Sequence, residues 1–190
     1  MIGSSLSGVS AATRPSKRVV LAGGTQLTRR IDTPDRENAQ GEQALNLVTY
    51  PWRTTLPGWH IVFLPERTGY LAMTFRLDRR IEVYVRADRS PEALAHDIAH
   101  ELGHAVDVTY NNDESRAAYR ALRAVPATTP WWACNSCTDL QTLAGDFAET
   151  FALLAAPSYR FYGQLAPAPT GSALERIGAA IDETTGAARA

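Results

Sequence analysis

Two histidines and a glutamate in one short stretch of the chain have the spacing of a zinc hydrolase site. The stretch reads His100-Glu101-Leu-Gly-His104, which matches the H-E-x-x-H pattern. On a helix, residues four apart lie on the same face, so both imidazoles can bind one ion. Glu101 points to one side, where it can act on a water at the metal. We therefore expect His100 and His104 to be metal ligands and Glu101 to be the general base.

The alternative is a surface helix that carries two histidines by chance. Leu102, Ala105 and Val106 are apolar, so we expect this helix to be buried on at least one side, where unpaired histidines are costly. That pattern favours a zinc site. His96, one turn before the motif, is expected to flank the site only, because Asp97 and not a glutamate follows it.

The third ligand must come from outside the motif, because a tetrahedral catalytic zinc has three protein ligands and one open position. The extended metzincin motif would place Gly and His where this chain has Asp107 and Tyr110. A second helix is expected over 139–156, with Glu149 and Asp146 about 60° apart on one side of it. Glu149 is favoured as the ligand because its side chain is longer, and Asp146 then supports a ligand. In the alternative, Asp146 binds the metal and Glu149 is the support. The remaining possibility is that both acids form ordinary ion pairs.

The two helices resemble the gluzincin metallopeptidases, especially compact anthrax lethal-factor-like catalytic domains and related small bacterial zincins. The resemblance rests on His-Glu-Leu-Gly-His-Ala-Val-Asp at 100–107 and Asp-Phe-Ala-Glu-Thr-Phe-Ala at 146–152, and it covers about residues 44–160. It implies a zinc peptidase in which one acid of the second helix binds the metal and a second acid, one turn later, supports a ligand histidine. The chain departs from that pattern at Gly145, which occupies the usual ligand position.

Other roles are left open by the sequence. Lethal-factor-like enzymes also use a tyrosine just before the glutamate helix to stabilise the oxyanion, but no tyrosine lies between Tyr119 and Tyr159 here. Tyr110, Tyr159 and Tyr162 are the available phenols, and spacing does not choose among them. Asp107, one turn beyond the motif, is expected either to orient a histidine or an arginine, or to be a solvated helix residue.

Three strands and several helices are expected to position these side chains. Alternating apolar residues predict the strands, and the short link between the last two predicts an antiparallel hairpin. Ser90, Pro91 and Glu92 form a typical helix start, so the motif helix begins there. The expected strands are 59–64, 70–77 and 80–86; the expected helices are 42–50, 91 to about 111, 113–124, 139–156 and a short last one that begins near residue 172.

The strand 80–86 is expected to direct Ile81, Val83 and Val85 inward. We expect it to form the edge of the sheet along which an extended substrate pairs, so that its outward side chains contact the substrate. The alternative is that these side chains only solvate the sheet.

Length, charge and apolar content limit the kinds of partner that we expect for this chain. The chain has 190 residues and a formal net charge of −1, which gives no reason to expect nucleic acid or an anionic membrane as a partner. No apolar run approaches the roughly 20 residues of a membrane span. We expect a mobile N-terminal arm over 1–40, a metallopeptidase domain over 41–165, and a linker with a short helix over 166–190.

Cys134 and Cys137 are the only cysteines. They predict a short local disulfide in an exported protein, and the alternative is two reduced thiols in a loop. The first twelve residues lack the charged and apolar regions that are typical of a signal peptide. Secretion is therefore favoured by the cysteine pair alone.

These patterns together predict an α+β, zincin-like fold, in which a small antiparallel or mixed sheet packs on the motif helix and a second helical lobe carries the third ligand. The expected activity is zinc-dependent endopeptidase activity on a peptide or protein substrate, with one zinc ion per chain. The alternative is a non-catalytic zincin-like domain that binds a protein partner.

Overall fold

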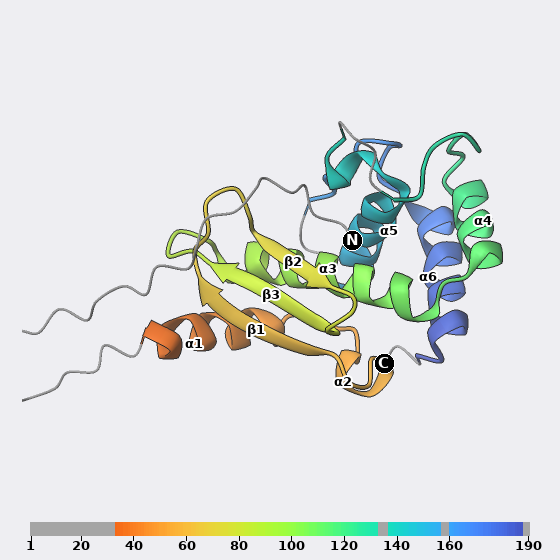
Figure 1. Ribbon diagram of the computed structural model, residues 1–190. Coiled ribbons are helices and arrows are strands. Elements are labelled where there is room, and N and C mark those ends of the chain that lie inside the picture. The colour runs from red at the N-terminus through yellow and green to blue at the C-terminus, as the bar shows by residue number, and fades with distance from the viewer. Residues whose placement is uncertain (1–32, 133–136, 157–159, 188–190) are drawn as a thin grey trace, which may run out of the picture.

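A computed structural model describes residues 33–132, 137–156 and 160–187. Within these ranges the fold is α+β, with a three-stranded mixed sheet and six α-helices (Figure 1). In chain order, the elements are α1 (Thr33–Leu45), α2 (Trp52–Thr55), β1 (His60–Pro65), β2 (Ala72–Phe75), β3 (Arg80–Val85), α3 (Pro91–Tyr110), α4 (Asp113–Leu122), the 3-10 turn η1 (Asp139–Gln141), α5 (Leu143–Ala155) and α6 (Gly171–Thr185).

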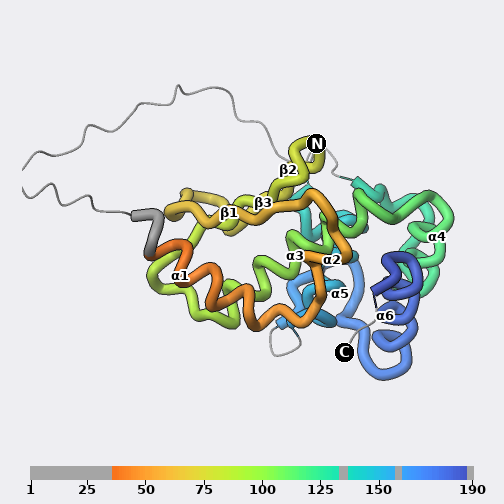
Figure 2. The backbone as a smooth tube through the Cα atoms, turned by 90° about the horizontal axis from the view of Figure 1, so that it is seen from below, coloured from red at the N-terminus to blue at the C-terminus, as the bar shows by residue number. Residues whose placement is uncertain are grey.

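The sheet and the helices form layers. One face of the sheet is covered by α1 and α3, and α5 packs along α3 (Figure 2). The helices α4 and α6 contact each other at the far end of the molecule from α1 (Figure 1). Among the helices of the described ranges, none has both the length and the apolar character that crossing a membrane requires.

The strand order is β1-β3-β2, which places β3 in the centre of the sheet. The predicted antiparallel hairpin of β2 and β3 is confirmed, as is the inward, buried position of Ile81, Val83 and Val85. The prediction that 80–86 forms the sheet edge is wrong, because β1 pairs with β3 in parallel on its other side. Of its outward side chains, Tyr84 is only 4% exposed. Within the described part of the sheet, β1 and β2 are the edge strands.

Helix α3 forms where the sequence predicts it. The hydroxyl of Ser90 accepts a hydrogen bond from the backbone N–H of Ala93 at 3.2 Å, and Pro91 occupies the first turn. Its side chains are buried along most of its length, between the sheet and α5. At Gly103 a Cβ would lie 2.7 Å from the Cα of Ala148. Glycine therefore allows α3 and α5 to approach closely beside the motif.

The bounds of α1 and α5 differ most from the prediction, and α1 also ends at Leu45 and not at residue 50. Helix α1 begins at Thr33, so residues 33–40 are helical and not part of an arm; residues 1–32 lie outside the described ranges. Helix α5 begins at Leu143 and not at Asp139, because Thr142 caps it by accepting a hydrogen bond from the N–H of Gly145 at 3.0 Å. Residues 139–141 form the separate turn η1, which changes the position of one acidic side chain.

Candidate metal centre

Three side-chain atoms meet between α3 and η1. The Nε2 atoms of His100 and His104 are 3.2 Å apart, and Oδ2 of Asp139 lies 3.0 Å from the first and 3.2 Å from the second. The three side chains are only 13%, 5% and 28% exposed, respectively. Among the described residues, this is the group of histidine, cysteine and acidic side chains whose donor atoms converge closely enough to hold a metal ion.

The spacing and chemistry of this triad fit a small divalent cation. Donors at 2.0–2.1 Å around a tetrahedral zinc ion are about 3.3 Å apart, close to the separations of the three atoms here. Oδ1 of Asp139 is buried without a hydrogen-bond partner within the described ranges. A carboxylate and two imidazole nitrogens so close together are better satisfied by a shared cation than by one another.

Asp139 reaches this position because of the turn that carries it. Its carbonyl oxygen accepts hydrogen bonds from the hydroxyl and the N–H of Thr142, both at 2.8 Å, which folds η1 back over the start of α5. A Cβ at Gly145 would overlap that carbonyl and would lie 2.7 Å from Oδ2 of Asp139. The glycine that departs from the gluzincin pattern thus leaves the space that Asp139 occupies.

Glu149 lies on the other edge of the His100 ring. Its Oε1 is 2.7 Å from Nδ1 of His100 and 3.1 Å from Nε2 of His96, and its Oε2 accepts the N–H of Tyr162 at 2.6 Å. Glu149, favoured from the sequence as the third ligand, therefore lies at the Nδ1 edge of His100 and not beside the two Nε2 atoms. The rotation of α5 about its axis directs the Glu149 carboxylate to the Nδ1 edge of the His100 ring. The turn η1 places Asp139 beside the Nε2 atoms of His100 and His104. His96, expected only to flank the site, shares the carboxylate.

The charges of these groups shift one another's pKa. Burial alone would raise the pKa of Glu149, but hydrogen bonds from His100 and His96 outweigh it and lower that pKa to about 2. Burial likewise opposes ionisation of Asp139, yet the two neighbouring histidines hold its pKa well below the usual range. Burial would lower the pKa of His100, whereas its bonds to Asp139 and Glu149 raise it well above 6.5.

Zinc uptake is therefore expected to release a proton from His100. Because the pKa of His100 is raised without metal, the ring is charged at pH 7, and a metal can bind only its neutral form. We expect about one proton released per zinc at pH 7, with zinc affinity rising until the pH passes that raised pKa. Calorimetric titrations in buffers of different ionisation enthalpy measure the release. Glu149→Gln should reduce it, and zinc binding without any release at pH 7 would contradict the assignment.

Glu101 follows His100 on α3, and its charge contributes to the raised pKa of His100. Its side chain is buried, and its Oε2 is 2.6 Å from the hydroxyl of Thr74 on β2. The structure thus brings His100 and His104 together, as their spacing predicts, and the charge of Glu101 acts on His100.

Asp146 is turned toward α4 and away from the triad. Its carboxylate accepts hydrogen bonds from Arg123, at 2.7 Å to Oδ2 and 2.9 Å to Oδ1, and from the hydroxyl of Tyr119 at 2.8 Å. Arg123 also donates to the carbonyl of Pro167. Of the two roles expected for Asp146, ligand and support of a ligand histidine, this geometry provides neither. The carboxylate instead joins α5, α4 and the segment that leads to α6.

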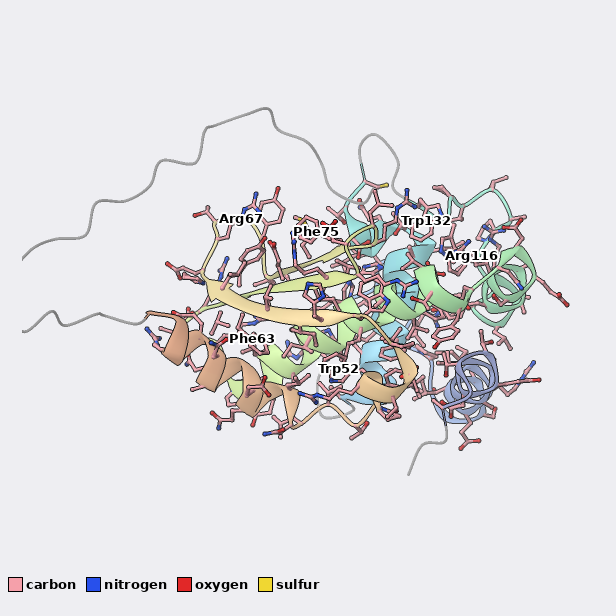
Figure 3. All side chains as sticks on the ribbon, turned by 60° about the horizontal axis from the view of Figure 1, so that its bottom comes forward. Trp52, Phe63, Arg67, Phe75, Arg116 and Trp132 are labelled. Carbon is pink, nitrogen blue, oxygen red and sulfur yellow. The ribbon has the colours of Figure 1, made fainter. Side chains whose placement is uncertain are left out.

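Among the residues that the structure describes, Asp107 is hydrogen-bonded to an arginine and to no histidine. Its Oδ1 accepts hydrogen bonds from Arg116 at 3.1 Å and Asn111 at 3.0 Å, and its Oδ2 accepts the indole N–H of Trp131 at 2.8 Å. The side chain is fully buried. Figure 3 shows Arg116 beside Trp132, whose ring lies 5.0 Å from the guanidinium. Asp107 therefore anchors the segment that leads toward η1.

The other sequence candidates have separate places. The hydroxyl of Tyr110 donates to the backbone carbonyl of Thr55, and the ring of Tyr162 lies 5.4 Å from that of His96. Cys137 is disulfide-bonded; Cys134 and Tyr159 lie outside the described residues.

Comparison of the chain with protein-family models, with curated proteins and with solved structures gives no significant match.

Asp139 is the site residue that the sequence did not predict. On an uninterrupted helix over 139–156, Asp139 would lie on the side of Asp146, about two turns before it. Only the separate turn η1 brings its carboxylate to the two histidines. The sequence does contain a local indication of where α5 begins. Thr142 is a good helix N-cap residue, and Gly145 stands three residues after it. A helix start at that threonine frees the acid before it to face the histidines.

Proposed function

We propose that this protein is a zinc-dependent metalloendopeptidase whose metal is held by His100, His104 and Asp139. The single observation that carries the proposal is the convergence of these three donors beside α3, the helix that also carries Glu101. The resemblance of both helices to those of gluzincin peptidases supports the same activity.

The composition of the triad favours zinc. Two imidazoles and one carboxylate are a usual ligand set for catalytic zinc, and three ligands leave a position open for water or substrate. Glu149 orients a proposed ligand. Its hydrogen bond to Nδ1 of His100 holds the ring so that Nε2 faces His104 and Asp139. A carboxylate behind a ligand histidine also makes the imidazole a stronger donor.

Hydrolysis requires an activated water and a group that transfers its proton. A zinc ion in this site would supply a nucleophilic water near neutral pH and polarise the peptide carbonyl. Glu101 would accept the proton of the attacking water and pass it to the leaving amine. Because Oε2 of Glu101 is engaged by Thr74, Oε1 is the oxygen assigned to this transfer.

The edge strand β2 is the place proposed for the substrate backbone. It pairs with β3 on one side only within the described sheet, and Thr74 joins it to Glu101. An extended peptide can add its backbone hydrogen bonds to such an edge. This replaces the role that the sequence suggested for β3.

Metal analysis and peptide digestion test the proposal together. The purified chain is expected to hold about one zinc ion and to cleave a mixed peptide library at internal bonds, and a chelator should stop the cleavage. His100→Ala and His104→Ala should lose both properties. Stoichiometric zinc in the double variant would exclude this site, whereas a zinc-loaded wild type that cleaves nothing would favour a non-catalytic domain that binds a protein partner.

A further inference from the structure

The hydroxyl of Thr74 connects the edge strand to the proposed general base. Its Oγ1 lies 2.6 Å from Oε2 of Glu101 and 3.1 Å from the backbone carbonyl oxygen of the same residue. A hydroxyl has one proton to donate, and a separation of 2.6 Å is typical of an O–H group bound to a carboxylate. The proton is therefore assigned to the bond with the Glu101 carboxylate.

Both ends of this hydrogen bond are held by rigid elements. Thr74 is paired with Ile81 in the β2–β3 ladder, and Ile81 is fully buried. Threonine is branched at Cβ, so its side chain has few rotamers open to it. Glu101 stands on α3, which is buried between the sheet and α5. A carboxylate held from two such elements keeps one orientation at little further cost in entropy.

We propose that Thr74 is a positioning residue for the reaction of Glu101. It fixes Oε2 and so presents Oε1 to the water that attacks the substrate. The proposal rests on the proposed function, because it takes Glu101 as the base. It adds a link between chemistry and substrate binding, since Thr74 belongs to the strand on which the peptide backbone is proposed to lie.

Matched variants separate positioning from packing. Thr74→Val keeps the shape of the side chain and removes the donor, whereas Thr74→Ser keeps the donor. For Thr74→Val we expect kcat to fall about 10- to 100-fold, which is the scale of a misplaced catalytic group. KM and zinc affinity should change little, because Thr74 contacts none of the three proposed ligands in the described structure. Thr74→Ser should recover most of kcat.

Two controls sharpen the comparison. Thr54→Val removes an exposed hydroxyl that, among the described residues, bonds to the carbonyl of Pro51 alone, and kcat should not change. In a Glu101→Gln background, Thr74→Val should cause no further loss, because the two side chains act as one unit. A wild-type kcat in Thr74→Val, or an equal loss in Thr74→Ser, overturns the proposal.

Crystal structures of the wild type, Thr74→Val and Thr74→Ser give a readout without activity. We expect the Glu101 carboxylate to turn away from its wild-type orientation in Thr74→Val and to keep it in Thr74→Ser. An unmoved carboxylate in Thr74→Val overturns the positioning role even if the protein is a peptidase. If the carboxylate moves in Thr74→Val but the wild type binds no zinc or cleaves no peptide, the proposed function is overturned. The positioning of Glu101 by Thr74 is then still supported.

Discussion

Asp139→Ala is expected to lose zinc binding almost completely, while Glu149→Ala still fills its site at higher zinc concentration. Asp139 provides an oxygen beside both Nε2 atoms, whereas Glu149 contacts the opposite edge of the His100 ring. Removing a carboxylate that supports a ligand typically weakens metal binding about 10- to 100-fold, and removing a ligand should cost more than that. Competition titrations with a chelator of known zinc affinity measure both variants.

The two variants need a control for the loss of a negative charge. Asp113→Ala removes an exposed carboxylate at the start of α4 and should leave zinc affinity unchanged. Asp146→Ala is unsuitable, because it would leave Arg123 buried without its charge partner and destabilise the fold. If Glu149→Ala binds zinc more weakly than Asp139→Ala, Glu149 is the ligand and the bound state differs from the geometry described above.

Glu101→Gln is expected to retain zinc and to lose at least about a hundredfold in kcat, the low end for general acid–base catalysis. Glutamine keeps the length of the side chain and can still accept the hydrogen bond of Thr74, but it cannot take up a proton. The substitution leaves His100, His104 and Asp139 themselves unchanged, so their mutual contacts are expected to remain. Zinc analysis alongside the kinetics of peptide cleavage checks both parts of the expectation.

The outcome also separates an enzyme from a binding domain. Full activity in Glu101→Gln would assign proton transfer to another group. If the wild type and the variant both hold zinc and neither cleaves any peptide, the carboxylate has no catalytic task, and the alternative of a partner-binding domain is favoured.

The parts of the site that could be predicted are those that local periodicity determines. His100 and His104 share a helix face because they are four residues apart, and the hydroxyl and proline at 90 and 91 locate the start of that helix. The hairpin of β2 and β3 followed from alternation and a short link. Each of these features depends on residues that are close in sequence, so the pattern contains the information that is needed.

The parts that could not be predicted depend on contacts between distant segments. Nothing in β3 itself indicates that β1 pairs with it in parallel, and that pairing leaves β1 and β2 as the edge strands of the described sheet. The buried face of α5 showed that Asp146 and Glu149 need partners, but those partners are Arg123 of the α3–α5 connection and two histidines of α3. Sequence spacing shows that a buried carboxylate needs a partner, but it does not show which residue that partner is.

Asp139 occupies the space that a side chain at position 145 would fill. This bears on how similar sites can be recognised in other sequences. The same point beside two histidines can be reached by a side chain from the first turn of a helix or by one from the turn that precedes it. In the second case the helix has no room for a side chain of its own at that position. The sequence pattern is then a glycine where the acid would otherwise be. A motif that demands a carboxylate at the helical position would pass over every chain built in this way. One that also accepts an acid six residues earlier, paired with that glycine, would retain them.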